Sequence, residues 1–171
     1  MSDVLLTVSG IIDPSLGEQI AQGARPRADY LAIADTCNAD LLDYRQALAR
    51  GGVVGGVLAR LLGSNAALAW ACWRARKGYR VIVTDGEQVG IPLAILLKLI
   101  GRGPRNTQHL MIGHVVSVRK KMAPMDLFRA HTHIDRFLVY ATSQRQFIMN
   151  RWRVPDGRVS LLDVSTISLG E

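Results

Sequence analysis

Short runs of β-branched and aliphatic residues recur along the chain, each bounded by polar or small residues. Runs of this length and composition are typical of strands buried inside a sheet. The pattern therefore predicts strands over Val4–Val8, Tyr30–Ala34, Arg80–Thr84, His109–Ile112, Phe137–Tyr140 and Val159–Leu162.

Longer segments with apolar residues every three or four positions lie between most of these runs, a spacing typical of helices with one apolar face. The predicted helices are Asp40–Arg50, Val53–Leu62, Asn65–Lys77, Glu87–Ile100, Pro124–Thr132 and Ser143–Trp152. In the fourth of these helices, we expect Ile91, Ile95 and Leu99 to pack on the sheet. Lys98 is expected to reach solvent.

Strands that alternate with helices form crossover connections, and these produce a parallel sheet with helices on its faces. We therefore expect an α/β fold with a mainly parallel sheet of about six or seven strands and helices on both faces. The chain contains no internal repeat, low-complexity tract or linker, so residues 1–171 are expected to form a single domain.

The chain carries a net charge of +7, and its isoelectric point is near 10.0. This charge indicates an anionic partner such as a phosphate, a nucleic acid or an acidic membrane, although arginine-rich solvated helix faces are an equally good explanation. Aromatic residues make up only 6% of the chain and no known nucleic-acid-binding module is present, so nucleic acid is the least favoured partner.

Neither of the two cysteines, Cys37 and Cys72, belongs to a spacing motif, which is typical of reduced thiols in a cytosolic protein. The first residues do not form a signal peptide. The most apolar windows are interrupted by polar or charged residues, so no transmembrane helix is predicted. We expect a cytoplasmic protein.

Three predicted strands end in residues that could contact a ligand, and open parallel sheets bind ligands beyond the carboxyl ends of their strands. Small residues at these points are also typical of ordinary turns between strand and helix, and both interpretations remain open. The candidate catalytic residue is His114, because a neutral imidazole at a strand end can hydrogen-bond a sugar hydroxyl or a phosphate oxygen. The candidate substrate-binding residues are Ser9, Gly10, Gly17, Asp85, Gly86, Glu87, Gly113, Arg119 and Lys120.

The glycines of the loop Ser9–Arg27 lack the Gly-x-Gly-x-x-Gly spacing of a dinucleotide site, and the chain contains no Walker-type Gly-Lys-Ser/Thr. We therefore expect no bound cofactor. His131 and His133 could in principle join His114 at a metal, but no cysteine or carboxylate pattern accompanies them. No metal site is predicted.

Three segments, read in order, resemble a known family: "YRVIVTDGEQVGIPLAILLKLIGR", "HLMIGHVVSVRKK" and "RFLVYATSQRQFIMNRWRVPDGRVSLL". Their order and spacing resemble the N-terminal half of the family 4 glycosyltransferases, over about residues 79–162. The last segment is the most specific, with a strand, a Ser-Gln-Arg-Gln-Phe helix start and a Pro-x-x-Arg-Val turn. The resemblance implies one Rossmann-like half of the two-domain GT-B architecture.

In that family the N-terminal domain mainly holds the acceptor, and a His at a strand end contacts the transferred sugar, a position matched here by His114. The glycine-rich loop that approaches the donor diphosphate corresponds to Ser9-Gly10 through Gly17, although the usual paired glycine is absent. The implied reaction is retaining transfer of a sugar from a nucleotide-sugar donor to a sugar or a lipid-linked acceptor.

The family usually continues into a donor-binding domain, whereas this sequence ends with "SLLDVSTISLGE". The resemblance therefore implies an acceptor-binding half that is inactive until a second domain or chain supplies the donor site. Whether the chain is a natural split subunit or an excised domain is left open.

The segment "SVRKKMAPMDLFRAH" mixes cations with Met122, Met125, Leu127 and Phe128. That mixture suits peripheral contact with anionic lipids at the inner membrane face, but it suits somewhat better a surface loop leading into a partly buried helix. The alternative function is therefore a non-catalytic Rossmann-like module that binds an anionic ligand or a membrane surface.

Overall fold

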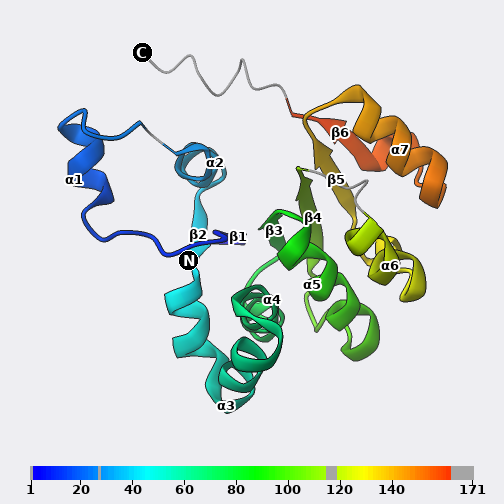
Figure 1. Cartoon of the computed structure of the whole chain (residues 1–171), viewed down its shortest axis with the longest axis horizontal. Helices are drawn as coiled ribbons and strands as arrows, with labels where there is room; N and C mark the ends of the chain where they lie inside the picture. Colours follow the sequence, from blue (N-terminus) through cyan, green and yellow to red (C-terminus); the bar gives the residue numbers. More distant parts are fainter. Residues whose placement is uncertain (1, 27, 115–118, 163–171) are drawn as a thin grey trace.

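The computed structural model describes residues 2–26, 28–114 and 119–162, with only the backbone described for residues 119–122. Six strands form one parallel sheet in the order β2-β1-β3-β4-β5-β6 (Figure 1). This confirms the predicted α/β class. The strands are β1 (Val4–Thr7), β2 (Ala39–Leu42), β3 (Val81–Asp85), β4 (Gln108–Gly113), β5 (Arg136–Val139) and β6 (Val159–Leu161).

Seven helices and two 3-10 turns connect these strands in the described part of the chain. Among them, α5 begins and ends at the predicted residues. The helices are α1 (Leu16–Ala21), α2 (Asp29–Cys37), α3 (Tyr44–Leu62), α4 (Ser64–Ala75), α5 (Glu87–Ile100), α6 (Arg119–Leu127) and α7 (Thr142–Trp152), and the 3-10 turns are η1 (Ala130–His133) and η2 (Asp156–Arg158).

The strand predicted over Tyr30–Ala34 is wrong, because these residues belong to α2. Tyr30, Ile33 and Ala34 are spaced as on one face of a helix, and they pack on the sheet. The second strand is instead Ala39–Leu42, which was predicted to start a helix. Short apolar runs fit either structure when periodicity is the only guide.

The two sides of the sheet are covered unequally. Leu5 and Ile82 point into a core shared with α4 and α5, whereas Leu6 and Val83 point to the opposite side, where α2 packs. α7 contributes to a third cluster, which also includes residues of α5. Among the described helices, α2 alone contributes to the core cluster on its side of the sheet.

The helix α5 lies very close to the sheet. A Cβ atom on Gly90 would lie 2.5 Å from the Met111 side chain and 2.7 Å from Thr84 Oγ1. The buried face therefore centres on Gly90, Leu93 and Leu97. As a consequence Leu99 points outward and is 67% exposed, so its predicted burial was wrong.

Lys98 is exposed as predicted, and its ammonium donates to the Phe128 carbonyl oxygen over 2.8 Å. Ile91 is buried, and Ile95 is partly buried. None of the described helices combines the length and apolar character needed to cross a bilayer.

Candidate functional site

The strand order changes direction at β1, because β2 is added on one side of it and β3 on the other. Ligands of open α/β sheets bind outside the carboxyl ends of the strands at such a switch point. Side chains hold the two strand ends together here: Thr7 Oγ1 accepts from the Asp85 amide over 2.9 Å, and Ser9 Oγ donates to the Asp85 carbonyl over 3.0 Å.

His114 follows the end of β4, and its Nε2 lies 3.0 Å from Asp85 Oδ1. Because a carboxylate only accepts, this contact places the proton of a neutral imidazole on Nε2 and leaves Nδ1 as an acceptor. The ring also stacks on Tyr140, with 5.5 Å between ring centroids, and Gln144 donates to the His114 carbonyl. His114 is thus held in one orientation, although its side chain is 45% exposed.

His114 and Asp85 open onto a cavity of about 220 Å³. Its lining combines apolar side chains with a few polar groups, which is the usual arrangement for a small-ligand site. The lining residues are Leu6, Asp29, Tyr30, Ile33, Asp85, Ile112, His114 and Tyr140.

The pKa of the Tyr140 phenol is raised, first by partial burial and then by the negative charges of Asp85 and Asp29. The hydroxyl therefore stays protonated at neutral pH and can donate a hydrogen bond into the cavity. Two carboxylates and a neutral phenol suit a polyhydroxylated ligand better than a phosphate, because carboxylates accept from hydroxyls and repel anions.

The structure places Ser9, Asp85, Gly113 and His114 together at the carboxyl edge of the sheet. Gly10 is adjacent, but its amide donates to the Val8 carbonyl and is therefore engaged within its own turn. The geometry does not offer this amide to a diphosphate.

Three other candidate residues do not line this cavity. Gly17 is exposed on α1, which contributes nothing to the cavity lining. Gly86 caps α5 with a φ of 106°, a conformation that favours glycine. Glu87 is buried in the first turn of α5 and lines a second, larger cavity between the helices.

Arg119 and Lys120 begin α6. Their side chains lie outside the described part of the structure, so the structure does not relate them to the cavity.

Sequence reasoning missed Asp29 and Tyr140. Tyr140 was available as a signal, because it ends a predicted strand and so had to reach the same edge as His114. Asp29 was hidden by the wrong prediction for Tyr30–Ala34, since an acidic residue in the first turn is informative only once the segment is known to be a helix.

His131 and His133 lie in η1, and neither lines the cavity. His131 stacks on Trp152, with 6.2 Å between centroids, and partial burial lowers its pKa. Within the described residues, no group of three or more His, Cys, Asp or Glu side chains is arranged to hold a metal ion.

Comparisons with protein-family models, with curated proteins and with solved structures find no match for this chain. The candidate site therefore rests on its own geometry.

Proposed function

We propose that this chain is the acceptor-binding half of a retaining glycosyltransferase, which moves a sugar from a nucleotide-sugar donor to an acceptor. The observation that carries the proposal is the His114–Asp85 hydrogen bond at the carboxyl ends of adjacent strands, beside the switch point of the sheet. The resemblance to family 4 enzymes assigns sugar contact to the His at this position.

In this proposal His114 orients the sugar and does not abstract a proton. With its Nε2 proton donated to Asp85, the neutral ring accepts a hydrogen bond from a sugar hydroxyl at Nδ1. The Tyr140 hydroxyl and the Asp29 carboxylate supply one donor and one acceptor from other parts of the rim.

In the reaction, an acceptor hydroxyl bonds to the anomeric carbon while the bond from that carbon to the nucleotide diphosphate breaks on the same face, and the hydroxyl proton passes to the departing diphosphate oxygen. The described cavity is bordered by two carboxylates, so it cannot stabilise the departing diphosphate. Cationic groups and oriented amides of a donor-binding domain, in the same protein or on a second chain, would provide that stabilisation.

The test is coexpression of the chain with a family 4 donor-binding domain, followed by transfer assays with labelled nucleotide sugars and with sugar and lipid-linked acceptors. We expect transfer with retained anomeric configuration. His114→Ala should lower turnover about 100-fold, since it removes the group that orients the sugar. Circular dichroism should show an unchanged fold, because the His114 side chain is only half buried.

His133→Ala is the matched control, because His133 is part of η1 and does not line the cavity. Turnover of this variant should equal that of the wild type. Equal turnover of the His114→Ala variant, or transfer with inversion, would contradict the proposal.

A further inference from the structure

The helix α3, which is kinked at Gly52, exposes its large apolar residues and buries its small ones. Its buried residues are Ala47, Gly51 and Gly55, and the two glycines lie against the Trp70 ring of α4. A helix on the surface of a water-soluble protein normally has the opposite arrangement, with large apolar residues in the core. The exposed apolar side chains on α3 are Leu48, Val53, Val54, Val57, Leu61 and Leu62.

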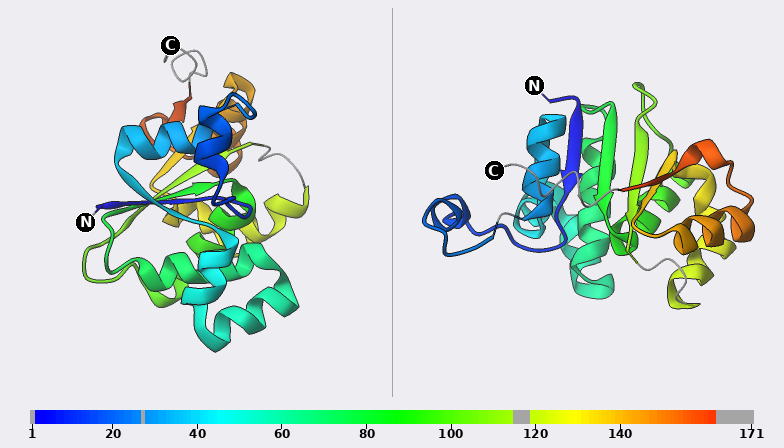
Figure 2. Two further views of the ribbon diagram at one scale, coloured as in Figure 1. Left: turned by 90° about the vertical axis from the view of Figure 1, so that its left-hand side faces the viewer. Right: turned by 90° about the horizontal axis from the view of Figure 1, so that it is seen from above.

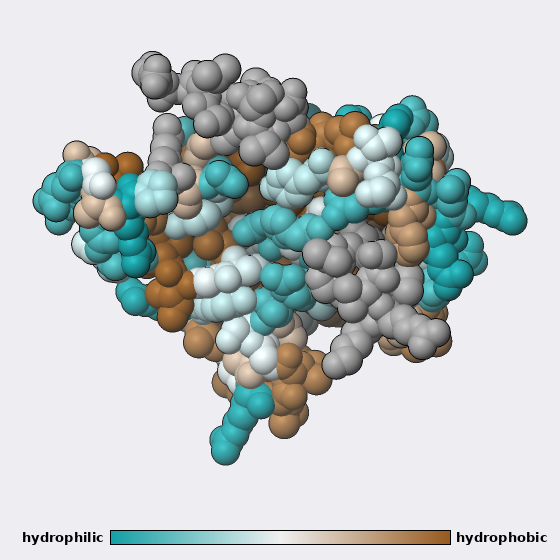
Figure 3. Space-filling view, turned by 45° about the horizontal axis from the view of Figure 1, so that its top comes forward, coloured by the Kyte–Doolittle hydropathy of each residue, from teal (hydrophilic) through white to brown (hydrophobic). Residues whose placement is uncertain are grey.

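Two further helix ends carry similar residues. Leu99 and Ile100 are exposed at the end of α5, and Leu127 and Phe128 at the end of α6. Elsewhere in the described chain, the exposed large apolar residues are Ile11 and Leu161. Figure 3 shows hydrophobic residues beside a projecting hydrophilic side chain at the lower tip of the molecule, which Figure 1 labels α3.

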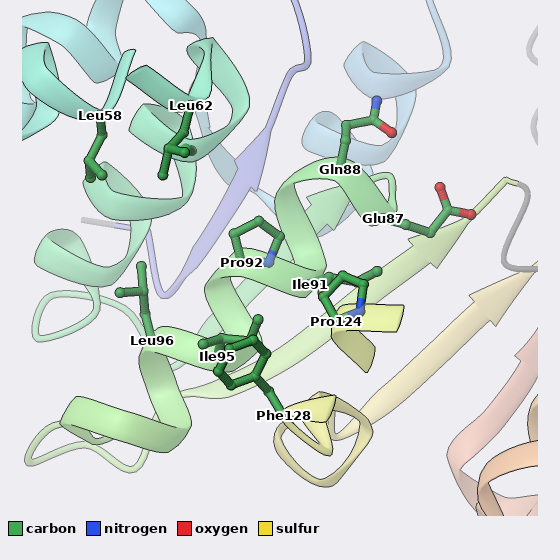
Figure 4. Close-up of a pocket in the computed structure, with 11 residues that line it drawn as sticks. Leu58, Leu62, Glu87, Gln88, Ile91, Pro92, Ile95, Leu96, Pro124 and Phe128 are labelled. Carbon is green, nitrogen blue, oxygen red and sulfur yellow. The ribbon is translucent and has the colours of Figure 1, made fainter. Parts of the chain in front are cut away.

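An apolar groove of about 410 Å³ runs between α3 and α6, with α5 as its floor. We call it the α3–α6 groove. In Figure 4, Leu58 and Leu62 of α3 lie across the groove from Phe128. It is lined by Leu58, Leu62, Ala66, Glu87, Gln88, Ile91, Pro92, Ile95, Leu96, Pro124 and Phe128.

The charged side chains of α3 and α4 are all cationic and exposed, and they are Arg45, Arg50, Arg60 and Arg74. The segment between Asp43 and Asp85, which includes α3 and α4, contains no acidic residue. α6 begins with three further cations in sequence, at positions 119–121. Of the other cations between Asp43 and Asp85, Arg76 is buried against the Trp73 ring and Arg80 pairs with Asp3, so neither belongs to this surface.

From these observations we infer that α3 and the α3–α6 groove form a docking surface for an anionic lipid bilayer. The exposed apolar side of α3 inserts shallowly among the acyl chains, one chain enters the groove, and the arginines contact the headgroups. A second copy of the chain fits less well, because α3 and α4 would bring cations against cations without any acidic partner.

This surface includes one part of the sequence that already indicated membrane contact. Leu127 and Phe128 are exposed, whereas Met125 is fully buried. The structure adds α3 as the larger contact, and the inference does not depend on the proposed transferase activity.

The test is co-sedimentation of the whole chain with vesicles of phosphatidylcholine alone and with vesicles containing one third phosphatidylglycerol. Binding is expected to the anionic vesicles and to weaken in high salt. The double variant Val57→Gln/Leu61→Gln should lower the partition constant by about tenfold or more. Arg60→Gln should lower it about fivefold.

Two variants away from α3 are the matched controls. Leu161→Gln removes an exposed leucine of β6, and Arg136→Gln removes an exposed arginine of β5. Both should bind as the wild type does. The inference would be overturned if the α3 variants bound as the wild type does, or if neutral vesicles bound as well as anionic ones. It would also be overturned if light scattering showed a dimer that the α3 variants fail to form.

The groove itself is tested by fluorescence. Leu62→Trp places a reporter at the groove, and Leu161→Trp places one on β6. Vesicles with bromine atoms on the acyl chains should quench the first reporter and leave the second unchanged, after subtraction of the wild-type signal. Equal quenching of both reporters would exclude an acyl chain in the groove.

Discussion

At the scale of single residues, a buried histidine makes the fold sensitive to acid. His109 is fully buried in β4; its Nδ1 lies 3.3 Å from the His133 carbonyl oxygen, and its Nε2 lies 3.0 Å from Thr84 Oγ1. The carbonyl can only accept, so Nδ1 carries the proton and Thr84 donates to Nε2. Burial lowers the pKa of this imidazole to about 4.

The lowered pKa predicts that stability falls as the pH is lowered. In the unfolded chain His109 takes up a proton near the ordinary histidine pKa of 6.5, whereas in the folded protein its lowered pKa delays protonation to about pH 4. The free energy of unfolding should therefore drop by roughly 2 kcal/mol between pH 7 and pH 5. Urea unfolding at the two pH values measures this difference.

His109→Gln should remove most of that drop, because an amide can occupy both hydrogen bonds without titrating. The control is His133→Gln, which changes a partly exposed histidine and should leave most of the drop in place. The carboxyl groups whose pKa is lowered, such as Asp135, lose their contribution only at more acidic pH. If the free energy of unfolding of the His109→Gln variant fell as much between pH 7 and pH 5 as that of the wild type, His109 would not be the cause of the drop.

At the scale of elements, the closest packing joins α5 to the sheet. Gly90 lets the helix approach Thr84 and Met111, and through Thr84 it also covers the hydrogen bond to His109. The helix thereby fixes the end of β3, where Asp85 enters the candidate site.

Gly90→Ala is therefore expected to destabilise the protein by about 2 kcal/mol, since its methyl group would overlap Met111 and Thr84. The matched control is Gly56→Ala in α3, where a Cβ atom would meet nothing within 4 Å. That change should stabilise by about 0.5 kcal/mol through helix propensity. Chemical denaturation of both variants provides the comparison, and a neutral Gly90→Ala would mean that α5 lies farther from the sheet.

At the scale of the whole molecule, the two sides of the sheet have different chemistry. The cavity with Asp29 and Asp85 adjoins α2, while the arginine-rich α3 and α4 lie on the opposite side. A ligand that carries hydroxyl groups and an anionic surface would therefore meet separate parts of the protein.

The packing also predicts that α1 unfolds locally more easily than the central strands. α1 buries only Leu16 and lies apart from the sheet in Figure 2, whereas Ile82 and Met111 are fully buried in the central strands. Native-state hydrogen exchange should be fastest for the α1 amides and slowest for those of β3 and β4. Protection in α1 equal to that of the central strands would show that α1 is held by contacts that the described structure lacks.

The sequence by itself determined the class of the fold and most of its elements. Local signals predict an element when its length and its flanking residues favour the same structure. Examples are the apolar run of β3, the periodic stretch of α5 and the glycine that follows α5. The position of His114 at a strand end was available for the same reason.

Only the tertiary structure decided which apolar segments became strands and which helix faces became buried. Tyr30–Ala34 forms a helix because its side chains pack together on the sheet, and the adjacent Ala39–Leu42 pairs with β1. The small residues of α3 face α4, which leaves its large apolar residues outside. Asp29 and Tyr140 meet at one cavity although they are far apart in sequence, because strand order and not periodicity brings them together.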